Sequence, residues 1–152
     1  MDRPVVLCGL GRVGWRVLES LRAAGQPVAV VDTAPPVDDP RLAGLTVVAG
    51  DCRRADVLER AGVRAARGVI IVTSDDLVNV CAALAVRQLN ADVRVVLRMY
   101  NQNLLARMGG AVRNAVALSV SGLTAPFLAL TAATGDALGA FKIDAHPQQI
   151  SE

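Results

Sequence analysis

Aromatic side chains are scarce in this sequence, and its charge is nearly balanced. Aromatic residues make up 3% of the 152 residues, too few for a surface on which nucleic-acid bases stack. The sixteen basic residues are scattered along the chain, and the formal net charge is only +2. A nucleic-acid-binding domain concentrates its basic residues on one face or along one helix. The composition therefore predicts no nucleic-acid partner.

Cysteine is present without the spacing of a metal site or of a disulfide framework. Cys8, Cys52 and Cys81 are odd in number and far apart, and no C-x-x-C pair occurs. We therefore predict no bound metal, and we interpret Cys8 and Cys81 as small buried hydrophobic residues. The start of the chain does not resemble a secretory signal, because its apolar run is short and interrupted by glycine. We expect a cytoplasmic location.

A glycine motif follows the first apolar run of strand length, Val5–Cys8. It has the form G-x-G-x-x-G, with Gly9, Gly11 and Gly14, and it opens a helix predicted over Arg12–Ala24. The first glycine permits a tight turn, the second lets a pyrophosphate lie against the backbone, and the third lets the helix pack closely on the strand. The N–H groups that begin the helix would face the phosphates. The alternative is a strand-to-helix turn without a ligand.

A second apolar strand, predicted over Val28–Val31, ends at Asp32. This carboxylate lies 18 residues after Gly14, close to the ~20 residues expected for the acid that binds a ribose diol. It would repel a 2′-phosphate, and the next residues, Thr33 and Ala34, offer no arginine to hold one. We therefore favour NAD or an adenosine nucleotide over NADP. The alternative is a carboxylate that only stabilises the turn.

Strands and helices are predicted to alternate along residues 1–118. Apolar patterns predict further strands at 46–49, 69–73, 93–97 and 115–118, and helices at 54–61, 77–89 and 102–108. Right-handed crossovers then give a Rossmann-like, doubly wound parallel α/β sheet with strand order 3-2-1-4-5-6. We assign residues 1–118 to this domain.

In such a sheet, ligands bind beyond the carboxyl ends of the strands. Asp51 follows the third predicted strand, where an adenine would lie, and Arg98 follows the fifth, where it would reach a phosphate. Asp51 has a structural alternative as the N-cap of the helix over 54–61. The structural alternative for Arg98 is an ion pair at the surface or at an interface.

The fourth predicted strand is followed by a polar run that begins the helix over 77–89. Ser74, Asp75 and Asp76 are suited to capping this helix, although Ser74 is also placed to meet a nucleotide. Asn79 lies one turn into the helix. Its position is compatible with a ligand contact or with a purely structural role.

Residues 114–135 contain no charged side chain, which raises the question of a membrane span. Polar residues and Pro126 interrupt the run, and its first part is predicted as a strand, so we favour a helix that is buried or faces a partner. Pro126 lacks an amide hydrogen and is expected to start, kink or end that helix. The apolar residues spaced by three and four are Val120, Leu123, Phe127 and Leu130.

We assign residues 119–135 to this helix, as a crossover or dimerisation helix. Residues 136–152 are expected to be a tail or the start of a further domain. Within them, 137–143 is compatible with a short strand, and the segment from His146 onward is expected to be a loose tail.

Residues for chemistry on a bound cofactor are not evident. Hydride transfer needs a substrate pocket and usually an acid or base beside the nicotinamide. The single histidine, His146, lies near the end of the chain, and neither Ser-x-x-x-Lys nor Tyr-x-x-x-Lys occurs. We therefore predict no catalytic residue and no enzymatic activity. The alternative is the cofactor-binding part of an NAD-dependent oxidoreductase.

Taken together, the stretches 5–14, 30–32, 50–51, 69–79 and 94–98 resemble the N-terminal domain of the RCK family, also called the TrkA-N or KTN domain. The Gly-Asp pair after the third strand and the D-D-x-x-N pattern after the fourth are not general Rossmann features. The resemblance implies a cytoplasmic regulatory domain that binds a nucleotide and gates a potassium channel or transporter.

The resemblance also implies the residues that hold the ligand. Phosphate would contact the glycine turn and its arginine. The ribose would contact Asp32, and the adenine side would contact Asp51. The other edge of the ligand would contact the ends of the fourth and fifth strands. Family ligands include NAD(H), ATP and ADP; we expect NAD(H), with ATP, ADP or AMP as alternatives. The predicted cofactor-binding residues are Gly9, Leu10, Gly11, Arg12, Val13, Gly14, Asp32, Thr33, Asp51, Cys52, Thr73, Ser74, Asp75, Asn79 and Arg98.

For partners, the resemblance implies a homodimer, an octameric ring built from dimers, and a membrane potassium channel or transporter. The domain would then be cytoplasmic or peripheral at the inner face of the membrane. The usual C-terminal regulatory domain of the family is missing, so we expect the chain to be part of a longer protein. A ligand-free dimerisation scaffold is a further alternative.

Overall fold

The structure of the protein is a computed structural model, which describes residues 3–101, 113–134, 139–143 and 146–150. The helix predicted over 102–108 lies outside the described residues.

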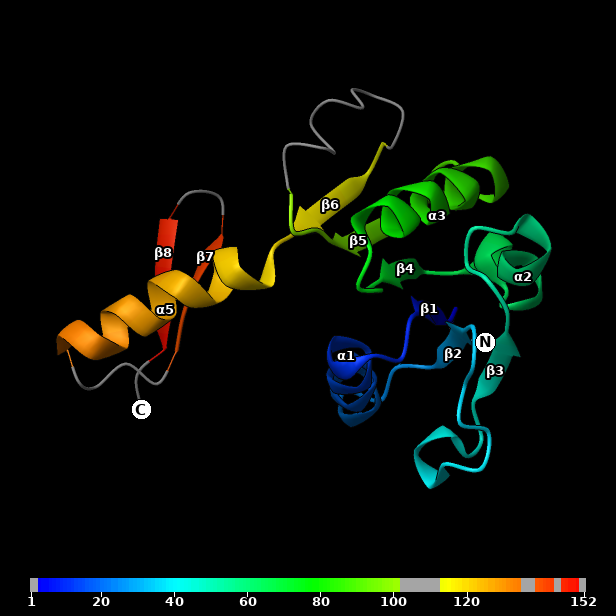
Figure 1. Cartoon of the computed structure of the whole chain (residues 1–152), viewed down its shortest axis with the longest axis horizontal. Coiled ribbons are helices and arrows are strands. Elements are labelled where there is room, and N and C mark those ends of the chain that lie inside the picture. The colour runs from blue at the N-terminus through cyan, green and yellow to red at the C-terminus, as the bar shows by residue number, and fades with distance from the viewer. Residues whose placement is uncertain (1–2, 102–112, 135–138, 144–145, 151–152) are drawn as a thin grey trace.

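Six parallel strands form one sheet (Figure 1). Their order is β3-β2-β1-β4-β5-β6, which confirms the predicted Rossmann-like topology. β1 and β4 are neighbours, with Cys8 beside Ile71, so the order of the strands reverses between them. In a doubly wound sheet a ligand binds at this switch point. The strands are β1 Val5–Cys8, β2 Val28–Asp32, β3 Thr46–Ala49, β4 Gly68–Ile71, β5 Arg94–Arg98 and β6 Ala115–Leu118.

Helices cover both sides of the sheet, with α1 on one side and α2 and α3 on the other (Figure 1). The α-helices are α1 Arg12–Ala23, α2 Ala55–Arg60 and α3 Asp76–Leu89, and the short 3-10 turns are η1 Pro40–Leu42 and η2 Val63–Ala65. Alternate strand residues pack toward opposite sides. Ile71 and Leu97 join the core under α2 and α3, whereas Leu7 packs with Leu18 of α1. Burial of each such side chain stabilises the fold by about 1.5–3 kcal/mol.

One strand is shorter than its sequence predicts. Apolar and β-branched residues continue to Thr73, yet β4 ends at Ile71. The amide of Thr73 donates to the Oδ1 atom of Asn79 at 3.2 Å instead of extending the ladder. A side chain on α3 therefore ends the strand and turns the chain into the loop that follows.

Within the part of the chain that the structure describes, no helix covers the α1 side of the sheet over β4, β5 and β6. Here Ile70 pairs with Val96, and Val96 pairs with Val116, so these side chains form one row across three strands. Val116 is 49% exposed and Leu118 on the same strand is 39% exposed. A parallel sheet is normally covered on both faces. We call Ile70, Val96, Val116 and Leu118 the open sheet face.

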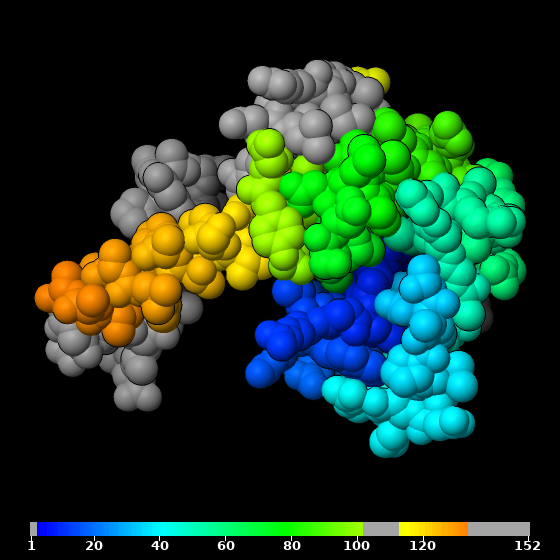
Figure 2. Space-filling view, viewed as in Figure 1, coloured from blue at the N-terminus to red at the C-terminus, as the bar shows by residue number. Residues whose placement is uncertain are grey.

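Helix α5, Val120–Thr134, extends away from the sheet (Figures 1 and 2). It continues through Pro126, so the proline neither starts nor ends it. Leu123 and Leu128 are 45% and 66% exposed. Of the two environments predicted for this helix, a buried one is therefore not what the described residues provide for these two side chains. Among the described residues, no helix is both long and apolar enough to cross a membrane.

Two short antiparallel strands follow α5, namely β7 Gly139–Ile143 and β8 His146–Ile150. The prediction of a loose tail from His146 onward was wrong. The sequence His-Pro-Gln-Gln-Ile carries little strand pattern by itself. Only two residues separate it from β7, which is the common length of a hairpin connection, and pairing with β7 supplies the backbone hydrogen bonds.

Candidate functional site

A pocket of about 670 Å³ opens at the carboxyl ends of the strands. This volume lies within the ~300–1,000 Å³ of typical small-molecule sites. Its walls come from the loops after β1, β2, β3, β4 and β5, which is the edge where the sequence predicts the ligand. The predicted residues that line it are Gly9, Gly11, Arg12, Val13, Asp32, Thr33, Asp51, Cys52, Thr73, Ser74, Asp75 and Arg98.

The three glycines of the turn after β1 have different surroundings. Gly9 has a φ of +100°, which favours glycine, and a Cβ on Gly14 would lie 1.9 Å from the carbonyl oxygen of Gly9. Gly14 therefore lies in the packing contact between α1 and β1, outside the pocket. A Cβ on Gly11 would meet no atom within 4 Å, and the φ of Gly11 is an ordinary −69°. Neither packing nor backbone conformation requires glycine at position 11, so the open space there suits a group from outside.

The first turn of α1 is suited to an anion. Gly11 is its N-cap and supplies no side chain, and the first turn contains no acidic residue. The leading N–H groups of a helix have no partner within the helix, and they carry the positive end of its dipole. Arg12 is exposed on the same turn and lines the pocket.

Asp32, at the end of β2, is held in place by backbone amides. Its Oδ2 atom accepts a hydrogen bond from Leu10 N at 2.7 Å, and its Oδ1 atom accepts one from Ala34 N at 2.9 Å. The amide of Leu10 is thereby occupied, and the side chain of Leu10 is buried in the core rather than in the pocket. Each carboxylate oxygen keeps a further lone pair. The side chain is therefore oriented and can still accept hydrogen bonds from a diol.

Asp51, after β3, pairs with Arg53 instead of capping α2. Its Oδ2 atom lies 2.6 Å from Arg53 Nη2, and Oδ1 accepts from the Arg53 amide at 2.9 Å. The N-cap of α2 is Arg54, without a side-chain cap, so the alternative of Asp51 as a cap is wrong. The hydrogen bonds from Arg53 hold the pKa of Asp51 below its ordinary value. Arg53 also lines the pocket and was not among the predicted site residues.

Asn79 is fully buried and fastens two loops of the pocket together. Its Nδ2 atom donates to Thr73 O at 3.1 Å and to Arg98 O at 2.8 Å. Its Oδ1 atom accepts from the amide of Thr73 at 3.2 Å and from the hydroxyl of Thr73 at 2.5 Å. All four hydrogen-bonding positions of the amide are filled by protein atoms. The direct ligand contact predicted for Asn79 is therefore not compatible with the structure, and its position holds the ends of β4 and β5.

The two acidic residues that begin α3 have separate tasks. Asp75 is the N-cap, accepting from Leu77 N at 2.8 Å and from Val78 N at 3.1 Å, as a cap is predicted to do. Asp76 was interpreted as a cap as well, but its carboxylate instead accepts from the amide of Tyr100 at 2.9 Å. It thereby ties the loop after β5 to α3.

Arg98 and Tyr100 form the far wall of the pocket. The guanidinium carbon of Arg98 lies 4.5 Å from the centre of the Tyr100 ring, and Arg98 Nη2 donates to the Tyr100 hydroxyl. The buried Nε atom of Arg98 has no partner among the described residues. Tyr100, 62% exposed, was not predicted to be part of the site. The remaining lining residues outside the predicted set are Val31, Gly50, Val72 and Val78.

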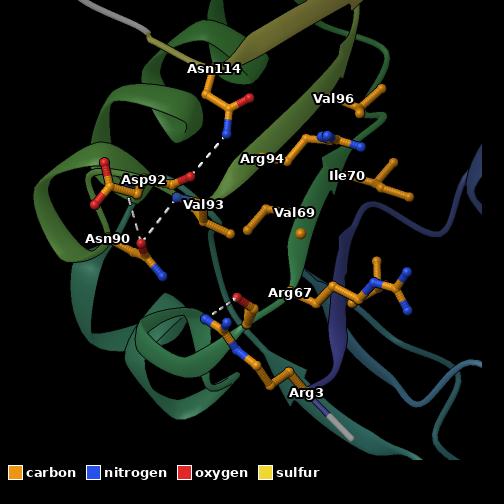
Figure 3. Close-up of a pocket in the computed structure, with 13 residues that line it drawn as sticks. Arg3, Arg67, Val69, Ile70, Asn90, Asp92, Val93, Arg94, Val96 and Asn114 are labelled. Carbon is orange, nitrogen blue, oxygen red and sulfur yellow. Dashed lines mark hydrogen bonds between the residues drawn. The ribbon is translucent and has the colours of Figure 1, made fainter.

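A second pocket, of about 580 Å³, lies at the opposite edge of the sheet, where the strands begin (Figure 3). Several of its polar groups are already used within the protein. The guanidinium of Arg3 donates to the carbonyl oxygens of Ala65 and Ala66, and Asn90 accepts from the amide of Val93 at 3.0 Å. It contains neither the glycine turn nor a residue predicted for the site.

The fold and the first pocket define a Rossmann-like α/β domain whose glycine turn suits a phosphate-bearing ligand. The sequence profile of the TrkA-N domain matches residues 5–117, which is most of the chain. The chain therefore belongs to the TrkA-N domain family.

Similar proteins agree with this assignment. The chain is 26% identical over 128 residues to potassium channel protein 1 of Methanocaldococcus jannaschii, a match that covers 81% of this chain and only 38% of the channel protein. The TrkA-N domain of inner membrane protein ybaL from Escherichia coli superposes with a TM-score of 0.76 at 21% identity, covering 86% of this chain and 96% of that domain. The GsuK channel bound to NAD superposes with a TM-score of 0.71 at 27% identity, and the match covers 86% of this chain and 23% of the GsuK chain. A structure of GsuK bound to ADP is also similar.

Proposed function

We propose that this chain is a regulatory domain that binds NAD(H) or an adenine nucleotide. The observation that carries the proposal is the open space at Gly11, where an added Cβ meets no atom within 4 Å at the uncapped start of α1. A turn that serves packing alone would fill this space. The pocket beside it is large enough for a nucleotide, and the oriented carboxylate of Asp32 borders it.

Each part of the ligand has a residue suited to it. The pyrophosphate would accept hydrogen bonds from the first amides of α1, with Arg12 adding positive charge. The ribose hydroxyls would donate to Asp32, and the base would lie toward Asp51. In a dinucleotide, the second half would extend toward Ser74 and Arg98. The buried Nε atom of Arg98, which lacks a protein partner among the described residues, would then donate to the ligand.

The similar proteins support a role in potassium transport. A potassium channel protein is among the relatives, and the GsuK channel has been solved with NAD and with ADP. We propose that the domain is cytoplasmic and that its ligand changes the state of a potassium channel or transporter in the membrane. A ligand can shift such an equilibrium only by its difference in affinity for the two states, typically ~1–3 kcal/mol.

The open sheet face and α5 support a homodimer. The row formed by Ile70, Val96 and Val116 has no covering helix within the described residues, and α5 carries exposed Leu123 and Leu128. Water-exposed apolar surface of this kind marks an interaction site. We propose that a second copy covers it, and that dimers are the unit from which any larger ring is built.

An NAD-dependent oxidoreductase is the second candidate. The hydroxyl of Tyr100 lies at the pocket wall and is the one phenolic proton donor among the lining residues, which include neither lysine nor histidine. A tyrosine that accepts a hydrogen bond from Arg98 is suited to ligand contact as much as to proton transfer. Reduction of NAD by an added alcohol or hydroxy acid in the presence of this protein would favour the enzyme.

Thermal unfolding with NAD, NADH, NADP, ATP, ADP and AMP tests the proposal, using protein shown to be free of bound nucleotide. A ligand at about 100 times its Kd stabilises the protein by ~2.7 kcal/mol, which raises Tm by several degrees at this size. We expect a shift with NAD or an adenine nucleotide that is lost in Asp32→Ala. If none of the six ligands raises Tm, nucleotide binding is excluded and the ligand-free scaffold remains.

A further inference from the structure

The second pocket, where the strands begin, takes no part in the proposed nucleotide binding. Its volume of about 580 Å³ lies within the range of small-molecule sites. Among the described residues, the two pockets share no lining residue, and they open at opposite edges of the sheet. A molecule bound in the second pocket would therefore be a second ligand of the domain.

The lining of this pocket has an excess of positive charge. It contains three arginines, Arg3, Arg67 and Arg94, and one acidic residue, Asp92, which leaves a net charge of +2. Within the described part of the chain, none of the three arginines forms an ion pair with a carboxylate. Asp92 points away from Arg67 and Arg94 (Figure 3). A cleft lined by charge of one sign concentrates ions of the opposite sign, so this pocket favours an anion.

Two of the guanidinium groups keep donors that a ligand can use. Nη1 of Arg67 donates to Oε1 of Gln26 at 2.7 Å, which fixes the side chain beside the end of α1. The guanidinium of Arg94 has no hydrogen-bond partner among the described residues. Each guanidinium has five N–H donors in a planar fork that matches the two oxygens of a carboxylate. Arg67 and Arg94 are therefore suited to bind carboxylates.

Gly68 leaves open space between these two arginines. It directly follows Arg67 and pairs with Arg94 on the neighbouring strand. Its φ lies outside the left-handed region, and an added Cβ would meet only the carbonyl oxygen of Arg94, at 3.6 Å. Neither backbone conformation nor packing requires glycine here, and a glycine in a strand often marks the close approach of a ligand. Further along the strands, the paired side chains of Ile70 and Val96 continue the pocket as an apolar floor.

Hydrogen bonds hold the opposite wall of the pocket in place. The Oδ1 atom of Asn90 accepts from the amide of Val93 at 3.0 Å, and Nδ2 of Asn114 donates to the carbonyl oxygen of Asp92 at 2.9 Å. Behind them, Arg87 donates to the carbonyl oxygens of Asn90 and Asn114, both at 3.1 Å. Because the wall is already ordered, binding has a smaller entropic cost.

We propose that this pocket binds a small dicarboxylate. One carboxylate pairs with Arg67 and the other with Arg94, and the short apolar chain between them lies on Gly68 and the floor beyond it. Neighbouring strands are about 4.8 Å apart, so a short chain can connect the two arginines. A dianion balances the net charge of the lining, and inorganic phosphate has no apolar part to cover the floor. The site does not depend on nucleotide binding, whereas its use as a second input to a regulatory domain rests on the proposed function.

Titration with glutarate at constant ionic strength tests the proposal by ¹H–¹⁵N NMR. We expect the amides of Ile70 and Val96 to shift, and those of Gly11 and Thr73 in the nucleotide pocket to stay in place. Pentanoate has the same chain with one carboxylate and should bind about tenfold more weakly, because it loses the hydrogen bonds to one guanidinium. Unchanged amides at Ile70 and Val96, or phosphate that binds as tightly as glutarate, would overturn the proposal.

Variants test the pocket residues separately. Arg94→Gln should weaken glutarate binding about tenfold. Gly68→Val should abolish it by filling the open space, and valine is favoured in strands. Arg60→Gln is the matched control, because it removes the same charge from an exposed position on α2 outside the pocket. If Arg60→Gln weakens binding as much as Arg94→Gln, glutarate responds only to total charge and the site is wrong. Circular dichroism checks that each variant is folded.

Asp32→Ala distinguishes this inference from the proposed function. Glutarate should bind this variant as tightly as the unmodified protein, because Asp32 lines only the first pocket. Glutarate binding in a protein whose Tm no nucleotide raises would overturn nucleotide binding and support the dicarboxylate site. A nucleotide-dependent Tm without glutarate binding would overturn the dicarboxylate site alone.

Discussion

Substitution by alanine is expected to affect nucleotide binding at Gly11, and both stability and binding at Gly14. We expect Gly11→Ala to weaken nucleotide binding by about tenfold or more, because the methyl group fills the space next to the first amides of α1. Its cost to folding should be about 1 kcal/mol or less, because alanine is only a poorer N-cap than glycine. Titration of the nucleotide and urea unfolding measure the two effects.

Gly14→Ala is the matched control. Its Cβ would lie 1.9 Å from Gly9 O, so α1 must move away from β1. Overpacking of this kind typically costs ~1–3 kcal/mol, so this variant should lose stability as well as binding. If Gly11→Ala binds nucleotide as tightly as the unmodified protein, the phosphate does not lie at this turn.

The ion pair between Asp51 and Arg53 predicts a specific titration. Arg53→Gln should return the pKa of Asp51 toward its ordinary 3.8, because hydrogen bonds from Arg53 are the largest cause of the lowering. A carboxylate with a lowered folded-state pKa stabilises the protein above its unfolded-state pKa, and this contribution is lost as the pH falls through the folded-state value. NMR titration of the carboxyl carbon measures the shift.

Arg54→Gln provides the comparison for that titration. Arg54 pairs with Asp56 at 3.0 Å and affects Asp51 only weakly. Its loss should move the pKa of Asp56 upward and leave Asp51 nearly unchanged. Equal effects of the two substitutions on Asp51 would mean that the pair with Arg53 does not persist in solution.

Residues that were identified from their local spacing lie at the pocket, whereas pocket residues whose position depends on contacts across the fold were not predicted. The glycine turn and Asp32 were identified because a strand, a turn and a second strand fix their spacing. Arg53 and Tyr100 reach the pocket only through the particular turns after β3 and β5. The burial of Asn79 depends on a carbonyl group 19 residues further along the chain.

At the level of elements, Asn79 connects the ends of β4 and β5. We expect Asn79→Leu to destabilise the domain by about 2–4 kcal/mol, because it leaves partly buried backbone groups of Thr73 and Arg98 without partners. Gln88→Leu, at an exposed position of the same helix, should change stability by no more than about 0.5 kcal/mol. Urea unfolding of both variants tests the assignment, and equal stabilities would contradict it.

The order of the six strands followed from the sequence because apolar runs and helical spacing alternate without interruption. Such a pattern leaves few topologies once crossovers are right-handed. The hairpin of β7 and β8 was only half predicted, since β8 acquires its structure by pairing with β7. The end of β4 was misplaced for a similar reason, because the side chain of Asn79 on α3 accepts a hydrogen bond from the amide of Thr73.

At the level of the whole molecule, the open sheet face is apolar surface that no helix covers within the described residues. If a second copy covers it, a charge placed there must disrupt the dimer. We expect Val116→Asp to shift the protein from dimer to monomer, because an unpaired carboxylate would be buried in an apolar contact. Size-exclusion chromatography with light scattering at several concentrations measures the mass.

Val37→Asp is the control with identical chemistry. Val37 is 72% exposed and lies in the loop between β2 and η1, away from β4, β5 and β6. The Val37→Asp substitution should leave the dimer intact. A loss of the dimer in Val116→Asp alone would therefore show that the open sheet face is the interface, and that added negative charge by itself does not separate the two copies. In the monomeric variant the nucleotide should still raise Tm, because the loops that form the pocket belong to one chain. A Val116→Asp protein that stays dimeric would exclude this face as the interface and leave α5 as the surface to examine.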